Sequence, residues 1–312
     1  MSSKGMSRYS LFKKEKKVPV FTFYDPKEDV NFIQSKKTDR LAVADEATAE
    51  LSSMIGLDNI KKWIINQKAV INLDQRRREN GINITNNQTM HMVFLGNPGT
   101  GKTECARLIA KIYYGLEIMP TDSFVEVSRR ELIGDGYKTS AEKVNEIFKE
   151  AIGGVLFIDE AYSLCYGPAD QNGREAVDTL LKLMEDYRDS IVVIMAGYTN
   201  EMLAFLKTNP GFESRIPANN KLTFFDYTED ELVSIFKYMI KKNGYILAKD
   251  VTDDNIRVAI RKMPKTKGNA RDIRNFLDNV KMNLDLILNE KSCTDQFDLI
   301  TITNESIKAA LL

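Results

Sequence analysis

The stretch Gly96–Thr103 fits the pattern of a phosphate-binding loop, in which spaced glycines precede a lysine and a hydroxyl residue. The apolar run His91–Leu95 precedes it, and a helical pattern begins at Lys102. Glycines let the backbone turn so that its N–H groups face phosphate, and the helix adds its positive N-terminal end. A plain glycine turn is the alternative, which the match and its flanks disfavour. We expect phosphate to be bound by Asn97, Pro98, Gly99, Thr100, Gly101, Lys102 and Thr103.

Two acidic residues, Asp159 and Glu160, directly follow the apolar run Val155–Ile158. In an open parallel sheet, ligands bind at the carboxyl ends of the strands, so these side chains are expected beside the phosphate loop. Asp159 together with Thr103 would hold Mg²⁺, and Glu160 would polarise a water for attack on the terminal phosphate. An Asp-Glu pair capping a helix is the alternative, and the upstream phosphate loop disfavours it.

Short apolar runs alternate with helical patterns through the middle of the chain, which is typical of a parallel sheet covered on both faces. We predict an α/β fold with a five-stranded parallel sheet, followed by a small C-terminal helical lid. The predicted domains are an N-terminal extension, partly disordered, at 1–48, a nucleotide-binding domain at 49–226 and a lid at 227–312. The expected strands are His91–Leu95, Ser123–Val127, Val155–Ile158, Ile191–Ala196 and Lys221–Phe224. After about Tyr227 we expect helices and no further strands.

Composition limits the possible partners. The 312 residues contain 44 basic and 44 acidic side chains, so the net charge is zero and nucleic acid is not an expected partner. No apolar run is long enough to span a membrane, and the three cysteines lack a metal-like spacing. We therefore expect a cytoplasmic protein. The lysine cluster Lys13–Lys17 is interpreted as a solvated charge run, and Val18–Tyr24 as a possible added strand.

Several motifs together resemble one branch of the AAA+ ATPases, the CbbX-like family, which includes red-type Rubisco activases and stage V sporulation protein K. The resemblance covers about 50–288. The motifs that carry it are Ile55-Gly56-Leu57, His91-Met92, Gly96–Thr103, Gly153–Tyr162, Ala196-Gly197-Tyr198 and Asn209–Ile216. The resemblance implies a P-loop AAA+ sheet with a helical lid, ATP and Mg²⁺ as cofactors, and self-association into a ring, expected to be a hexamer.

The resemblance also implies roles for individual residues. Thr199 would be the sensor that positions the attacking water, with Tyr198 and Asn200 as neighbouring candidates. Arg215 would be an arginine finger for the next subunit in the ring, and Arg271 would be a second sensor on the lid. Ile55 and Gly56 would border the adenine. Without the motifs, Arg215 and Arg271 could equally be ordinary ion-paired residues.

One loop departs from the family pattern. Ring translocases of this kind carry an aromatic–aliphatic–glycine triplet after the second strand, to grip substrate in the pore. Here Leu132–Ser140 lacks that triplet, and its aromatic residue, Tyr137, is displaced by one position. Tyr137 is therefore a possible pore residue, with packing against a neighbouring helix as the alternative.

We expect a ring ATPase that remodels a protein client, and the sequence does not name that client. A nucleotide-gated assembly switch with slow turnover is the second hypothesis, which the displaced Tyr137 favours somewhat. A nucleic-acid motor or loader is the third, and the balanced charge weighs against it.

Overall fold

The computed structural model describes residues 30–82, 89–167, 169–264, 266–291 and 295–311. The chain divides into two units, Met1–Thr38 and Asp39–Leu312. The segments Lys13–Lys17 and Val18–Tyr24 lie outside the described residues.

A five-stranded parallel sheet forms the centre of the α/β part, in the order β2-β3-β4-β1-β5. Its register pairs Phe94 of β1 with Ala196 of β4 and with Leu222 of β5. The predicted sheet is confirmed, with strand ends that differ by at most one residue. The strands are β1 (Met92–Leu95), β2 (Phe124–Val127), β3 (Val155–Ile158), β4 (Val192–Gly197) and β5 (Lys221–Thr223).

Alternate side chains of the three central strands, β1, β3 and β4, enter two separate cores. Met92 and Phe94 of β1 face one core, whereas Val93 and Leu95 face the other. Both sets are buried, which explains why the strands are continuously apolar in sequence. Each fully buried side chain of this size contributes about 1.5–3 kcal/mol, so the two cores stabilise the central strands of the sheet.

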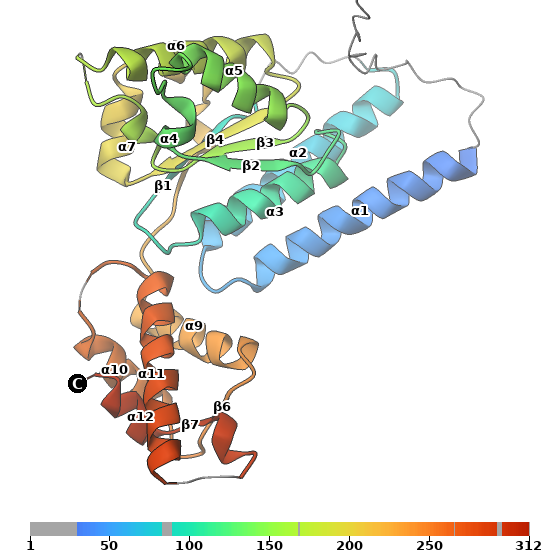
Figure 1. Ribbon diagram of the computed structural model, residues 1–312. Helices are drawn as coiled ribbons and strands as arrows, with labels where there is room; N and C mark the ends of the chain where they lie inside the picture. Colours follow the sequence, from blue (N-terminus) through green and yellow to red (C-terminus); the bar gives the residue numbers. More distant parts are fainter. Residues whose placement is uncertain (1–29, 83–88, 168, 265, 292–294, 312) are drawn as a thin grey trace, which may run out of the picture. The chain divides into compact units, whose positions relative to one another are not determined.

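Helices cover both faces of the sheet (Figure 1). Residues of α1, α2 and α3 build the first core, and residues of α5, α6 and α7 build the second. These helices are α1 (Val30–Ser53), α2 (Asp58–Glu79), α3 (Lys102–Gly115), α5 (Ser140–Ala151), α6 (Gln171–Asp186) and α7 (Thr199–Leu206). Two short helices complete this part, α4 (Arg129–Leu132) and α8 (Gly211–Arg215).

Helix α1 crosses the expected boundary at 48/49 and begins within the region predicted as a partly disordered N-terminal extension. Two of its buried side chains are alanines, Ala44 and Ala47, and Leu51 is the one large buried side chain among its described residues, so the helical pattern is weak. The small side chains let α1 and α3 pack closely, since a Cβ on Gly115 of α3 would lie 2.5 Å from the Cβ of Ala44. The Arg40 guanidinium also lies over the Tyr114 ring, 4.7 Å from its centre.

The lid has its own core, in which the rings of Phe236 and Phe276 lie 5.5 Å apart. Its helices are α9 (Glu229–Lys242), α10 (Asp253–Lys262), α11 (Ala270–Glu290) and α12 (Asn304–Ala309). The prediction that strands cease after Tyr227 is wrong. Strands β6 (Ile246–Leu247) and β7 (Thr301–Ile302) form a small parallel pair. With two residues each, they are too short to produce a periodic pattern.

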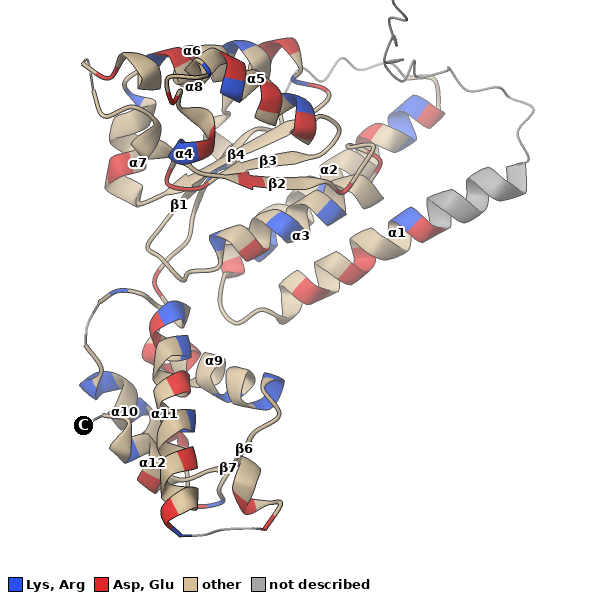
Figure 2. Cartoon of the chain, viewed as in Figure 1, with Lys and Arg blue, Asp and Glu red and all other residues tan. Residues whose placement is uncertain are grey.

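Charges are mixed over the surface helices, with Lys and Arg interspersed among Asp and Glu, whereas β1, β3 and β4 carry none (Figure 2). No helix in the described part of the chain combines the length and the apolar character needed to cross a bilayer.

The single histidine, His91, is fully buried beside β1. Its Nδ1 accepts a hydrogen bond from the Val193 N–H at 3.1 Å, so Nε2 is the nitrogen that donates, to the Met184 carbonyl at 3.0 Å. Burial lowers the pKa of His91, the Met184 carbonyl and Glu185 oppose that shift, and Arg215 adds to it. His91 is therefore a core histidine, held in the neutral form.

The burial of His91 predicts that the folded chain loses stability in acid. Because the folded-state pKa is lowered, protonation favours the unfolded chain once the pH falls below the ordinary value of 6.5. We expect the free energy of unfolding to fall below that pH, with His91 adding up to about 1.4 kcal/mol per pH unit to the slope. Urea unfolding of the unmodified chain and of His91→Gln at several pH values measures this. Equal slopes for the two proteins would contradict it.

Candidate active site

The carboxyl ends of β1, β3 and β4 meet the lid at a pocket of about 310 Å³. The pocket brings together most of the residues predicted from the phosphate loop and the acidic pair. Its lining consists of Gly96, Pro98, Gly99, Gly101, Lys102, Thr103, Glu104, Asp159, Glu160, Gly197, Tyr198, Ala270, Arg271 and Arg274.

Every carbonyl from Gly96 to Gly101 accepts a hydrogen bond. Lys102 Nζ donates to the carbonyls of Gly96 and Asn97, both at 2.8 Å, and the Cys105 N–H donates to Gly101. The remaining donors come from the linker and the lid. Asn269 Nδ2 donates to Pro98 (3.3 Å), the Ala270 N–H to Gly99 (3.2 Å) and the Tyr227 hydroxyl to Thr100 (3.3 Å).

Three consecutive N–H groups of the same loop are free within the described part of the chain. Among the described residues, the N–H groups of Gly99, Thr100 and Gly101 have no hydrogen-bond partner. Helix α3 starts at Lys102, and the first N–H groups of a helix have no partner within it. A run of unpaired N–H groups at a helix start is an anion-binding arrangement. The loop is therefore built to bind phosphate.

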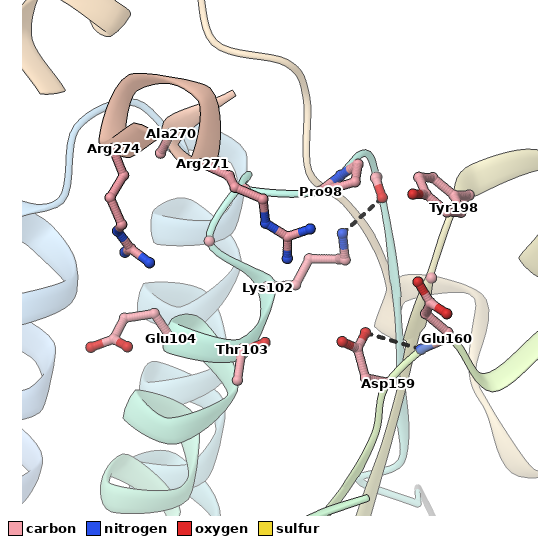
Figure 3. Close-up of a pocket in the computed structure, with 14 residues that line it drawn as sticks. Pro98, Lys102, Thr103, Glu104, Asp159, Glu160, Tyr198, Ala270, Arg271 and Arg274 are labelled. Atoms are coloured by element: carbon pink, nitrogen blue, oxygen red, sulfur yellow. Dashed lines mark hydrogen bonds between the residues drawn. The ribbon is translucent and has the colours of Figure 1, made fainter. Parts of the chain in front are cut away.

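Figure 3 shows Lys102 and Arg271 directed into the same cleft, with Thr103 and Asp159 on opposite sides of it. Burial lowers the pKa of Lys102, while the nearby Asp159 carboxylate opposes that shift. One Asp159 oxygen accepts the Glu160 N–H at 3.0 Å. In the described residues the other oxygen and the Thr103 hydroxyl have no protein partner, and such oxygen ligands suit Mg²⁺.

Glu160 has an unusual backbone conformation, with φ 47° and ψ 44°. A side chain other than glycine in this left-handed region costs about 1–3 kcal/mol. The turn is retained because Glu160 is followed by the 3₁₀ helix η1 (Ala161–Leu164), whose Ser163 N–H donates to the Glu160 carbonyl at 2.8 Å. As a result, the Glu160 carboxylate lines the pocket beyond the end of β3.

A second cavity, of about 610 Å³, adjoins the phosphate pocket. Ile55 lines it, together with Tyr227, Ile235 and Met239, so it offers an apolar surface of the kind that adenine needs. Gly56 does not line this cavity and packs against the lid instead, where a Cβ would lie 2.4 Å from Glu231 Oε1. Gly99, Gly101, Glu104, Ala270 and Arg274 line both cavities.

Comparison with known proteins agrees with this geometry. Residues 92–216 match the family model of the ATPase family associated with various cellular activities, and residues 228–311 match an AAA lid domain. The chain is 38% identical to stage V sporulation protein K of Bacillus subtilis, over 75% of this chain and 73% of that protein. It is 37% identical to the chloroplastic ribulose bisphosphate carboxylase/oxygenase activase of Cyanidioschyzon merolae, over 87% of this chain and 92% of that protein.

The chain belongs to the CbbX-like family of AAA+ ATPases. Its enzymatic activity is ATP hydrolysis. The crystal structure of the FIGL-1 AAA domain in complex with ADP has a TM-score of 0.53 at 17% identity, covering 83% of this chain and 82% of that one. That similarity shows the fold alone.

Three residues that the family resemblance predicted lie away from the pocket. The pocket lining at the end of β4 is Gly197 and Tyr198, and among the described residues Thr199 does not line it. Arg215 lies on α8, where its Nη1 donates to the Gly211 carbonyl at 3.0 Å and its Nε lies 3.6 Å from a Glu185 oxygen. Their roles as sensor and arginine finger stay predictions.

The third such residue, Tyr137, is 98% exposed, so the alternative in which it packs against a neighbouring helix is wrong. The loop that presents it is ordered by Asp135. Its carboxylate accepts the N–H groups of Tyr137 and Lys138 and lies 3.0 Å from Lys143 Nζ. Hydrogen bonds from these groups, Lys143 first, lower the pKa of Asp135 to about 2.

Sequence reasoning missed four residues of the site. Arg274 follows Arg271 by one helical turn, and that spacing could have indicated it. Asp226 accepts the side-chain amides of both Asn97 and Asn269, with N–O distances of 2.8 Å to its Oδ1. Asn269 and Tyr227 are the other two, and the Tyr227 hydroxyl donates to the Thr100 carbonyl. Asp226, Tyr227 and Asn269 act on a loop far from them in sequence, which no local motif indicates.

Asp226 is therefore predicted to support nucleotide binding without touching nucleotide. In Asp226→Ala, Asn97 and Asn269 lose their shared acceptor, and the phosphate loop loses part of its link to the lid. At about 1 kcal/mol for such a hydrogen bond, we expect roughly fivefold weaker ADP binding. Titration with a fluorescent ADP analogue measures it. Asp250→Ala is the matched control, because that carboxylate also accepts an amide, that of Asn304, within the lid. Equal affinity in both variants would refute the prediction.

Proposed function

We propose that the chain is a ring ATPase that uses ATP with Mg²⁺ to remodel a protein client. The observation that carries this proposal is the meeting of Lys102, Asp159, Glu160 and Arg271 in one pocket between the α/β part and the lid. A pocket that contacts both parts can link the state of the nucleotide to the position of the lid. The relatives named above support a remodelling role by analogy alone.

In the proposed mechanism, the free N–H groups of the phosphate loop and Lys102 bind the phosphates of ATP. Thr103 and Asp159 would hold Mg²⁺, which neutralises phosphate charge when bound. Glu160 accepts the proton of the attacking water, a role worth about 10²–10⁴-fold in rate. Arg271, on the lid, places a second positive charge in the pocket that would bind the phosphates. Tyr198, from the end of β4, is the better-placed candidate for orienting that water, since it lines the pocket and Thr199 does not.

Arg215 is proposed to act on the neighbouring subunit. It does not line the pocket of its own chain, and its guanidinium lies in a separate groove on α6 and α8. Its side chain is 20% exposed, and its buried Nε has no hydrogen-bond partner in the described chain. The weak 3.6 Å contact with Glu185 leaves the guanidinium available for the γ-phosphate of an adjacent site.

Tyr137 is the proposed contact with the client. Its ring is almost fully exposed on an ordered loop, so it is accessible to a client. The two relatives have different names and similar identities, so neither name selects the client. Capture with the Glu160→Gln protein in the presence of ATP is the experiment that identifies it.

A comparison of Glu160→Gln with Lys102→Ala separates a motor from a nucleotide-gated switch. We expect Glu160→Gln to bind ATP and assemble but to lose turnover by about 10²–10⁴-fold, because the base is absent and the phosphate loop is intact. Lys102→Ala should lose ATP binding as well. ATP-dependent sizing, nucleotide titration and phosphate release measure these effects. If Glu160→Gln still remodels the captured client at the full rate, binding rather than hydrolysis performs the work.

Mixing two inactive variants tests the role of Arg215. Arg215→Ala should lose about 10³–10⁵-fold in turnover if its guanidinium acts on the γ-phosphate. When Arg215→Ala is mixed equally with Lys102→Ala, about a quarter of the interfaces in random rings pair an intact phosphate loop with an intact Arg215. We expect ATPase activity to reappear in this mixture and not in either variant alone. A mixture as inactive as its components would place Arg215 outside the neighbouring site.

A further inference from the structure

One guanidinium joins three segments next to the acidic pair. Arg129 Nη1 lies 2.6 Å from the Ser163 carbonyl, 2.7 Å from the Leu164 carbonyl and 2.8 Å from Asp170 Oδ2. The same guanidinium lies over the Tyr166 ring, 4.5 Å from its centre. The Arg129 side chain is 25% exposed and that of Asp170 is 15% exposed, so the network is largely screened from solvent.

The sheet explains why Arg129 reaches this position. Helix α4 begins at Arg129, directly after β2, and β2 pairs in parallel with β3 so that Val127 lies opposite Ile158. The first residues after both strands therefore emerge at the same edge. Arg129 extends from the end of β2 to the 3₁₀ helix that follows β3, and binds the carbonyls at its far end.

That 3₁₀ helix carries Glu160 at its start in the strained left-handed conformation. Two bonds hold the near end of the turn: the Glu160 N–H donates to Asp159, and the Glu160 carbonyl accepts the Ser163 N–H. Without Arg129, the Ser163 and Leu164 carbonyls lose their shared donor, and the turn can relax away from its strained geometry. A shift of about 1 Å in a catalytic group can lower a rate about 10²-fold.

We propose that Arg129 is a positioning residue for Glu160. It holds the turn that places the Glu160 carboxylate in the nucleotide pocket, and Asp170 fixes the guanidinium from the other side. The same segment continues into the loop of Tyr137, since the Ile133 N–H donates to the Arg129 carbonyl at 3.0 Å. Movement of the Tyr137 loop or of Tyr166 is thereby transmitted to Glu160. This inference rests on the proposed role of Glu160 as the base.

The test compares Arg129→Ala with the control Arg130→Ala. The control removes the same charge from the neighbouring position on α4, where the Arg130 side chain is exposed and has no ion pair or hydrogen bond in the described chain. We expect Arg129→Ala to lower kcat about 10–100-fold, while the affinity for ADP stays within about twofold, because the phosphate loop is untouched. Arg130→Ala should keep the unmodified kcat. Phosphate release gives kcat, and titration with a fluorescent ADP analogue gives affinity.

Two conservative variants keep the test decisive if Arg129→Ala fails to fold. Arg129→Lys retains one donor and should recover part of kcat. Asp170→Asn keeps an N-cap for α6, where Asp170 accepts the Gly173 N–H, but weakens the ion pair, and should give an intermediate kcat. Unmodified kcat in both would overturn the proposal, as would a loss of ADP affinity in parallel with kcat. Full turnover in Glu160→Gln would instead refute the role of Glu160 itself.

Discussion

The active site depends on how the peptide groups of the phosphate loop are turned. Each carbonyl from Gly96 to Gly101 has a donor, and this is what leaves the N–H groups free to face phosphate. Two donors come from the lid, at Asn269 and Ala270, and one from Tyr227 in the linker. Because these hydrogen bonds support the conformation of the loop, we expect movement of the lid to change the loop and, with it, nucleotide binding.

Close approach between the loop and the lid also explains particular glycines. A Cβ on Gly99 would lie 2.1 Å from the Gly268 carbonyl oxygen, and a Cβ on Gly96 would lie 2.4 Å from that of Phe224. Both distances are shorter than any real contact of this kind. The phosphate-loop pattern is usually explained by the need for backbone to approach phosphate. In this chain the glycines also let the lid and the residue after β5, Phe224, approach the loop.

The sequence predicted the elements and site residues that depend on residues close to one another in the chain. Short apolar runs alternating with helical patterns predicted all five strands, most clearly the fully buried β1, β3 and β4. The spacing of Gly96–Thr103 and Asp159-Glu160 predicted most of the pocket. Site residues that depend on contacts between distant positions in the chain were not predicted. Asp226 is 129 residues from Asn97, and Asn269 is 171 residues from Pro98. Helix α1 was missed because its contact with α3 uses alanine and glycine, which carry little periodic signal.

Glu160 stands between two spaces, and this position constrains how the enzyme can be regulated. On one side it lines the nucleotide pocket, and on the other it lines a cavity of about 680 Å³ together with Arg129, Gly134 and Tyr166. Any contact that reshapes the second space acts on a residue already held in a strained conformation, where a small loss of support changes its position. A relaxed glutamate on a regular helix would need a larger disturbance. With Glu160 as the base, as we propose, this strain would make hydrolysis sensitive to the loops that face away from the nucleotide.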